Sequence, residues 1–285
     1  MKPGKIRLVI TASLLVLLLS ACEQTAESTA EKTTDAALAS ATAAVPATAD
    51  AANNAEAKTS LDASAKPKLV SVTELFFQES EHGSEPYVTR MLVNENFIRI
   101  DEAGAAEGYV LFDRKKLRIF SVLHDSERIL VVDPVRPLGE IPADLRLTEK
   151  VLQETDAPAV DGIKPKHHQF SANDILCYSV IALDGFLPHV TSALKTYHGV
   201  LAAQQQETLD ATPKELQTPC YRANYVYAAE SHISKGFPFE QWDIEGHRRS
   251  FMQFNLDKNV DSTLFTLPEG YEFFMIGSGG GTTIM

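Results

Sequence analysis

The sequence predicts an α+β fold in which a curved antiparallel β-sheet, a half-barrel-like meander, is covered on one face by a helical insertion. Short apolar runs separated by turns fill residues 69–133. Apolar residues then recur at helical spacing over residues 187–201, and strand-like runs return after Cys220. Helices segregated to one face of an antiparallel sheet are the usual result of such an order of elements.

The first residues have the three-part pattern of an export signal. Lys2, Lys5 and Arg7 form a basic start, and an apolar run occupies residues 8–19. That run is shorter than the roughly 20 residues that a membrane-spanning helix needs. Residues 1–21 are therefore interpreted as a cleavable signal peptide and are excluded from the fold.

The predicted signal ends in Leu19-Ser20-Ala21-Cys22. This stretch resembles the bacterial lipobox, in which a dedicated peptidase cuts before a lipidated cysteine. The resemblance implies a lipoprotein anchored through acyl chains on Cys22, palmitate among them, with about 0.8 kcal/mol contributed per buried methylene. By resemblance to Gram-negative sorting patterns, Glu23 favours the outer membrane, facing the periplasm, over the inner membrane. An ordinary secretory signal with an unrelated cysteine is the alternative.

Residues 22–66 are predicted to form a disordered tether. After Cys22 this segment is rich in Ala, Thr, Ser and Glu and has no aromatic residue. It cannot bury enough apolar surface to offset the entropy of ordering. A flexible coil of this length spans roughly 35 to 40 Å between its ends. A single domain, residues 67–276, is expected to follow, with a frayed glycine-rich tail at 277–285.

The charge of the chain excludes one class of partner. Loss of Lys2, Lys5 and Arg7 with the signal takes the formal charge from −12 to −15. Nucleic acids and anionic lipid headgroups both require dense basic patches, which this sequence lacks. Nucleic acid is therefore excluded, and the membrane contact is expected through covalent lipid alone. Solubility explains the acidic balance, and a basic ligand or partner is the alternative.

Six strands are predicted in the first half of the domain, because its runs are rich in Val, Ile, Leu, Phe and Tyr and end at polar turns. Apolar residues fall at both odd and even positions, as in Ile119, Phe120 and Val122. The sheet is therefore expected to be curved and partly buried on both faces. The expected strands are residues 69–78, 87–93, 97–101, 109–112, 117–123 and 128–132.

A helical insertion is predicted near residues 184–219. Its apolar residues are spaced three and four apart and share one helix face. Pro188 suits the first turn and Asp184 is the expected cap, while a second, shorter turn is expected at 212–215. The shared face consists of Leu187, Val190, Leu194, Tyr197 and Leu201.

Strand character returns after the insertion and completes the meander. The later runs again combine β-branched and aromatic residues with turn residues between them. The expected strands are residues 221–229, 240–244, 247–256 and 271–276.

Two cysteines are predicted to form a disulfide bond. With Cys22 committed to lipid, Cys177 and Cys220 are the remaining cysteines, and they flank the insertion. Such bonds persist in oxidising compartments. On the chain-entropy model, a disulfide bond here adds about 4 kcal/mol to the free energy of unfolding. It also ties the insertion to the sheet. A redox-active pair is the alternative, although such pairs usually have close spacing such as Cys-x-x-Cys.

The order of elements and the C-terminal stretches carry a family resemblance. They include Gly236-Phe237-Pro238-Phe239-Glu240-Gln241-Trp242, a late strand ending in a Phe-x-Leu-Pro-x-Gly-Tyr turn at 265–271, and the earlier strand 96–101. Together they resemble the lipoprotein-carrier (LolA/LolB-like) half-barrel superfamily over residues 69–271. The resemblance implies a concave apolar sheet under helices that holds acyl chains or a partner. It brings no catalytic residue, and the long insertion departs from the compact carriers.

The histidines do not predict a metal site. His167 and His168 are expected to be a solvated loop pair, because adjacent strand side chains point to opposite faces and rarely share an ion. His189 and His198 are nine residues apart on the predicted helix and face opposite sides. The sequence also lacks a Gly-x-Ser-x-Gly elbow, a His-Glu-x-x-His motif, a phosphate-binding loop and a calcium loop.

One pair of carboxylates is a candidate for catalysis. Asp243 and Glu245 lie two apart on one predicted strand face. General acid–base chemistry needs a partner acid or base within reach, and none is indicated, so both are expected to solvate a strand edge. No catalytic residue and no cofactor is predicted.

Aromatic residues of the C-terminal half are the candidate lining of a hydrophobic-ligand cavity. A concave binding face and an ordinary core use the same residue types, so the sequence leaves both open. The expected function is that of a non-enzymatic, lipid-anchored envelope protein that binds an acyl chain, a lipid or the lipid part of a lipoprotein. The alternative is a structural or regulatory module with a closed core that binds another envelope protein. The candidate lining is Tyr225, Tyr227, Phe237, Phe239, Trp242, Phe251 and Phe254.

Overall fold

The computed structural model describes residues 68–103, 108–133, 139–152, 157–160, 162–276 and 283–284. Within this part of the chain, thirteen strands form one sheet in the order β13-β12-β6-β5-β4-β3-β2-β1-β11-β10-β9-β8-β7. All neighbours are antiparallel except β12 and β6, which are parallel. The predicted open, curved sheet is confirmed, but the fold is mostly β rather than evenly α+β.

The strands vary widely in length. They are β1 (Leu69–Ser80), β2 (Tyr87–Val93), β3 (Phe97–Glu102), β4 (Gly108–Asp113), β5 (Arg118–Leu123), β6 (Arg128–Val132), β7 (Leu147–Leu152), β8 (Lys166–Ala172), β9 (Ile175–Leu183), β10 (Phe237–Asp243), β11 (Arg248–Asp261), β12 (Glu272–Ile276) and β13 (Thr283–Ile284).

The helical elements lie mainly between β9 and β10. None of the helices in the described ranges is long and apolar enough to cross a membrane. The elements are α2 (Pro188–Glu207), α3 (Pro219–Tyr221), the π-helical turn η3 (Arg222–Tyr227), and the 3-10 turns η1 (Leu209–Ala211), η2 (Lys214–Leu216), η4 (Ile233–Lys235) and η5 (Ser262–Phe265).

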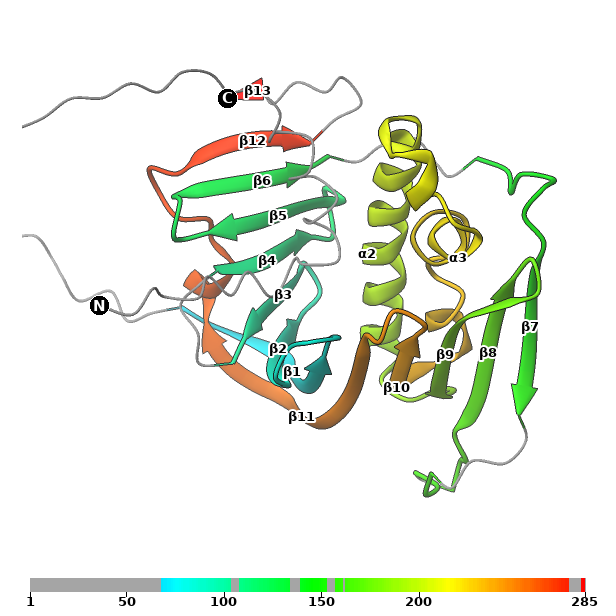
Figure 1. Ribbon diagram of the computed structural model, residues 1–285. Helices are drawn as coiled ribbons and strands as arrows, with labels where there is room; N and C mark the ends of the chain where they lie inside the picture. The colour runs from blue at the N-terminus through cyan, green and yellow to red at the C-terminus, as the bar shows by residue number, and fades with distance from the viewer. Residues whose placement is uncertain are drawn as a thin grey trace, which may run out of the picture.

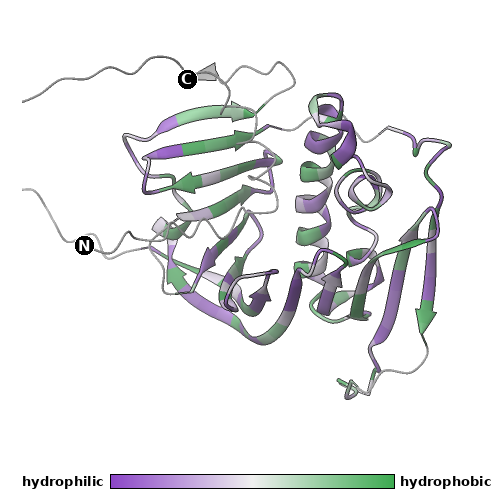
Figure 2. Ribbon diagram, viewed as in Figure 1, coloured by the Kyte–Doolittle hydropathy of each residue, from purple (hydrophilic) through white to green (hydrophobic). Residues whose placement is uncertain are grey.

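The sheet bends into two arms with α2 between them (Figure 1). Strands β2 to β6 and β12 form the first arm, β10 to β7 form the second, and β11 crosses the base. The strands of the first arm are largely hydrophobic, whereas β7 and β8 carry long hydrophilic stretches (Figure 2). The two arms therefore provide different surroundings for the helices.

The first arm is buried on both faces, as its sequence predicted. Met91 and Val93 of β2 pack in one cluster with residues of α2, while Leu92 between them packs in another. The second cluster is covered by Phe265 of η5 and by the residues that follow it. Because strand side chains alternate, this pattern places α2 on the concave face and η5 on the opposite one.

The start of α2 differs from the prediction. Pro188 occupies the first turn as expected, but the residue before it, Leu187, holds the cap position with φ of 43° and no side-chain cap bond. Asp184 instead belongs to the turn that leaves β9. The predicted apolar face is confirmed, because Val190 and Leu194 are buried in the concave core.

Residues 221–227 are helical and residues 228–229 lie in the turn that follows, so the strand predicted at 221–229 is wrong. Thr218 caps this region, its side-chain oxygen accepting a hydrogen bond from the backbone N–H of Tyr221, and Pro219 suits a first helical turn. The aromatic and β-branched residues that indicated a strand instead face neighbouring elements. Helical structure consequently continues beyond residue 219 to Lys235.

The predicted disulfide bond between Cys177 and Cys220 is present. Cys177 lies in β9 and Cys220 in α3, and both are buried beside Leu145, Ala172 and Ala223. The bond therefore ties the helical layer to the second arm, next to the cavity described below.

Candidate functional site

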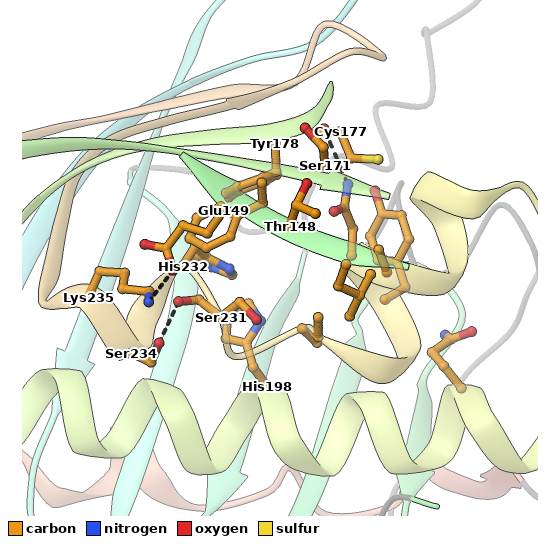
Figure 3. A pocket seen from close by; sticks show the side chains of 18 of the residues that line it. Thr148, Glu149, Ser171, Cys177, Tyr178, His198, Ser231, His232, Ser234 and Lys235 are labelled. Carbon is orange, nitrogen blue, oxygen red and sulfur yellow. Dashed lines mark hydrogen bonds and ion pairs between the residues drawn. The ribbon is translucent and has the colours of Figure 1, made fainter. Parts of the chain in front are cut away.

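A cavity of about 370 Å³ lies between the second arm and the helical layer. Its walls come from β7, β8 and β9 on one side, and from α2, η3 and the segment before β10 on the other (Figure 3). The volume is near the lower end of the roughly 300 to 1,000 Å³ that is typical of ligand pockets. Apolar side chains on both walls include Leu147, Phe170, Leu201, Ala223 and Ala228.

Polar groups gather at one end of the cavity. Lys235 Nζ lies 2.5 Å from Glu149 Oε2, and His168 Nδ1 lies 2.7 Å from Glu149 Oε1. Burial alone would raise the pKa of Glu149, but the bonds from Lys235 and His168 outweigh it and hold the pKa below its usual value. This carboxylate is therefore ionised and already paired.

Two further histidines, His198 and His232, line the same end of the cavity. Within the described residues, neither is bonded to a carboxylate as His168 is. The ring centroids of His198 and His232 lie 5.3 Å apart, and the ring of Tyr178 lies 4.8 Å from that of His232. Burial, assisted by the charge of Arg249, lowers the pKa of His198 to about 4. Burial and His198 likewise hold the pKa of His232 well below its usual value. Both imidazoles are thus neutral near pH 7.

Close packing brings the two histidines together. His198 lies on α2, and a Cβ atom at the next residue, Gly199, would lie 2.5 Å from Glu230 Oε1. After η4, Gly236 turns the chain into β10 with φ of 125°, where a Cβ atom would be 2.4 Å from the carbonyl oxygen of Leu183. Gly236 therefore fixes the path of the segment that carries His232 against β9.

Arg249 supplies positive charge on the concave side of the base strand β11. Its guanidinium lies 3.9 Å from the ring centroid of Phe77, and its Nε lies 3.2 Å from Glu79 Oε1. The Arg249 charge opposes protonation of both His198 and His232. It therefore contributes a positive potential at the polar end of the cavity.

We expect acid to destabilise the fold through the two buried histidines. Their folded-state pKa values lie below the usual 6.5, so between pH 6.5 and about 4 the unfolded chain binds more protons than the folded one. The free energy of unfolding should therefore fall as the pH is lowered through this window. Urea titrations at several pH values should show this fall, and it should be smaller in a His198→Gln/His232→Gln double variant. An equal pH dependence in both proteins would contradict the assignment.

The residues that were predicted to line a ligand cavity lie in several different parts of the structure. Tyr225 lines the cavity, although it does so from η3 rather than from a strand. Tyr227 packs against the disulfide cluster instead. Trp242 packs near His167, with ring centroids 5.1 Å apart. Its neighbour Asp243 pairs with Tyr178, whose side chain lines the cavity. Because strand side chains alternate, the Trp242 side chain lies on the opposite face of the sheet.

The four remaining residues of that list belong to the concave core. They surround Phe186 with ring centroids between 5.3 and 6.4 Å from it. They pack between the start of α2 and the base of the sheet. None of them contributes to the cavity wall. These residues are Phe237, Phe239, Phe251 and Phe254.

The two adjacent histidines lie in strand β8, so the prediction of a solvated loop pair is wrong. His167 packs on Trp242, while His168 is buried and bonded to Glu149. Their side chains point to opposite faces, as expected for neighbours in a strand. Pairing with β7 and β9 forms this strand despite its polar sequence.

The carboxylates of Asp243 and Glu245 lie at the turn between β10 and β11. Asp243 Oδ1 accepts hydrogen bonds from the backbone N–H groups of Glu245 and His247, and Asp243 Oδ2 lies 2.8 Å from His247 Nδ1. These bonds raise the pKa of His247. The group stabilises the turn, and Asp243 is largely buried rather than solvating an edge.

The helical histidines also occupy opposite sides of α2, as predicted. His189 lies on the side that faces β1, where its Nε2 is 2.8 Å from Thr73 Oγ1, and His198 faces the cavity. The predicted site residues did not include His198, His232 or Tyr178. A partial signal existed, since His198 follows the buried Leu194 by four residues. Cys22 and the predicted tether lie outside the described residues.

Comparisons with known proteins yield only distant structural likenesses. No family model matches the sequence, and no curated protein matches it either. An uncharacterized conserved protein from Thermus thermophilus is 9% identical with a TM-score of 0.34, over 72% of this chain and 90% of that one. A structure of PNGF-II is 12% identical with a TM-score of 0.35, over 72% of this chain and 31% of that one. At such TM-scores these likenesses define neither a family nor a function.

Proposed function

We propose that the protein is a non-enzymatic, lipid-anchored protein of the bacterial cell envelope that binds a small hydrophobic ligand. The observation that carries this proposal is the cavity of about 370 Å³ between β7–β9 and the helical layer. A module with a closed core would fill this interface with side chains. Apolar walls with a few convergent polar groups are instead typical of small-molecule sites.

The size of the cavity favours one acyl chain over a larger lipid. Its volume of about 370 Å³ is at the low end for drug-sized ligands, which need roughly 300 to 1,000 Å³. A lipoprotein anchor with three chains requires more room than one chain. The proposed ligand is therefore a single-chain amphiphile rather than the lipid part of a lipoprotein.

Two further observations support the envelope as the location. The Leu19-Ser20-Ala21-Cys22 stretch supports lipid attachment at Cys22, and Glu23 supports the outer membrane, facing the periplasm, as the destination. The bond between Cys177 and Cys220 supports an oxidising compartment, because cytosolic thiols are normally kept reduced. The resemblance to half-barrel lipoprotein carriers supports the same setting.

A second candidate is a protein-interaction module of the envelope. The observation that favours it is a pair of exposed apolar side chains, Met252 and Leu256, on the long base strand β11. Exposed apolar groups that form a patch mark contact surfaces. This candidate requires no ligand in the cavity, so a direct binding test separates the two.

We expect a bulky side chain in the cavity wall to abolish ligand binding. Ala228 lines the cavity, so Ala228→Trp should fill the space that a ligand needs. The probe is N-phenyl-1-naphthylamine, an uncharged fluorophore whose emission rises in apolar sites. Titration into the unlipidated mature chain, residues 23–285 made in an oxidising periplasm, should saturate, and the variant should bind at least tenfold more weakly.

The matched control is Thr196→Trp, which adds the same side chain at an exposed position of α2. This variant should bind the fluorophore as the unchanged protein does. Absence of saturable binding to the unchanged protein would overturn the proposal in favour of the interaction module. Equal binding by the Ala228→Trp variant would show that the fluorophore occupies another site.

A further inference from the structure

We propose that the natural ligand is a single-chain carboxylic acid whose carboxyl group is bound by the imidazoles of His198 and His232. This inference rests on the proposed function, because it requires the cavity to accept an apolar chain. It adds the chemical class of the head group and the residues that recognise it.

The first argument is the lack of hydrogen-bond partners for the two imidazoles. His232 is only 8% exposed and lines the cavity. Across the described ranges, neither the His198 ring nor the His232 ring makes a hydrogen bond; their contacts are with each other and with Tyr178 and Tyr197. Buried polar groups without partners destabilise a protein. A ligand that supplies the missing partners offsets this cost.

The second argument is the match between a neutral imidazole and a carboxyl group. A neutral imidazole has one N–H donor and one acceptor nitrogen. A protonated carboxyl group has one O–H donor and one carbonyl acceptor. The O–H can donate to one imidazole nitrogen while the carbonyl oxygen accepts from the other ring's N–H. Tyr178, whose ring centroid lies 4.8 Å from that of His232, also lines the cavity.

The third argument is the charge around the polar end. Arg249 on β11 and Lys235 at the end of η4 are positive, but each is paired with a carboxylate, Arg249 with Glu79 and Lys235 with Glu149. Glu149 also bonds His168. Burial and Arg249 both disfavour protonated imidazole here, as the lowered pKa of His198 reflects. The same groups disfavour an amine head group. Burial also disfavours a phosphate head, which keeps its charge on entry, whereas a carboxyl group can enter neutral, with its proton.

The remaining walls fit the chain of such an acid. Leu147 and Phe170 on the sheet side and Leu201 and Ala223 on the helical side supply apolar wall to the cavity. Gln205, also in the wall, is bonded to the Tyr221 hydroxyl at 2.9 Å, so it already has a partner. His198 and His232 lie together at the polar end of the cavity (Figure 3).

The test compares ligands that share one chain and differ in head group. Decanoic acid, methyl decanoate, decylamine and decyl phosphate would displace N-phenyl-1-naphthylamine from the mature chain, residues 23–285. We expect the acid to bind at least tenfold more tightly than the ester, the amine or the phosphate. Binding at neutral pH takes up one proton from solvent, so the affinity for the acid should rise up to tenfold per unit as pH falls from 7.5 to 6. The affinity for the ester should stay constant.

A double variant identifies the residues responsible. His198→Phe/His232→Phe keeps ring volume and removes the nitrogens, so the acid-to-ester ratio should fall to about one with the ester affinity retained. If that variant does not fold, His198→Gln and His232→Gln should each lower the ratio. The matched control is His189→Phe on the opposite side of the same helix, facing β1, which should leave the ratio unchanged.

The outcomes separate this inference from the proposed function. Binding of the fluorophore and the ester with no preference for the acid would overturn the inference and leave the proposed function standing. Tighter binding of the phosphate or the amine, or a preference that survives the double variant, would overturn it as well. Failure of the fluorophore and of all four ligands to bind would overturn both.

Discussion

Replacing Cys177 and Cys220 together by alanine is expected to lower the free energy of unfolding by about 4 kcal/mol. The bond joins residues 43 apart in sequence, and a loop of this length loses about that much chain entropy when it is closed in the unfolded state. For a domain of this size, the midpoint of thermal unfolding should fall by roughly 8 to 16 °C. Circular dichroism during heating and urea titration would measure both quantities.

Reduction provides the control for this prediction. Dithiothreitol should lower the stability of the unchanged protein to that of the double variant, and it should leave the double variant itself unaffected. Unchanged stability of the native protein after complete reduction would contradict the entropic account. Because Cys177 lines the cavity and Cys220 precedes η3, loss of the bond should also weaken fluorophore binding.

The first arm was predictable because its signals are local. Strands β2 and β6 begin and end where the sequence indicated, at Tyr87–Val93 and Arg128–Val132. Their β-branched and aromatic residues are buried on both faces, so almost every position contributes to the pattern. Polar turns at the ends of each run then set the boundaries.

In the second arm, β10 was predicted in part, as residues 240–244, whereas β7, β8 and β9 were missed. The run Ile175–Leu183 of β9 is apolar and typical of a strand, but β7 and β8 were missed because they are polar. Strand β7 reads Leu-Thr-Glu-Lys-Val-Leu and is mostly exposed, and β8 contains Lys166, His167 and His168. Such sequences have little intrinsic β-propensity, and pairing with neighbouring strands determines their structure. Strand β9 provides that pairing through contacts that no local window contains.

The error at residues 221–227 has a different cause. Val226 and the tyrosines there favour a strand by propensity, but the N-terminal Thr218 cap, Pro219 and the bond at Cys220 fix a helical start. Tertiary constraints of this kind routinely outweigh propensities that differ by less than about 1 kcal/mol.

The cavity was not predictable from spacing, because its walls come from segments far apart in sequence. Its lining residues come from the segments 147–149, 170–178, 198–205 and 223–235. The predicted lining had the right residue class, apolar and aromatic, and included Tyr225. It also included aromatic residues that fill the concave core, since burial in a core and burial against a ligand produce the same pattern.

Phe237→Ala is expected to lower the free energy of unfolding by about 3 to 5 kcal/mol while the folded protein keeps its ligand affinity. Phe237 is fully buried. Its ring centroid lies 5.0 Å from that of Phe251, 5.3 Å from Phe186 and 5.5 Å from Phe239. Removing the ring leaves a void among these neighbours, but the cavity lies elsewhere. Urea titration measures the first effect and fluorophore titration below the unfolding transition measures the second.

Met252→Ala is the matched control, because Met252 lies on β11 beside Phe251 with its side chain 53% exposed. Its effect on the free energy of unfolding should be within about 0.5 kcal/mol. Should Phe237→Ala prove unfolded, Phe237→Leu retains much of the volume and allows the binding measurement. A folded Phe237 variant that no longer binds the fluorophore would show that the aromatic core contacts the ligand, as the sequence interpretation proposed. Retained affinity with reduced stability would assign these rings to packing, and would leave His198, His232 and the apolar walls beside them as the residues that determine what is bound.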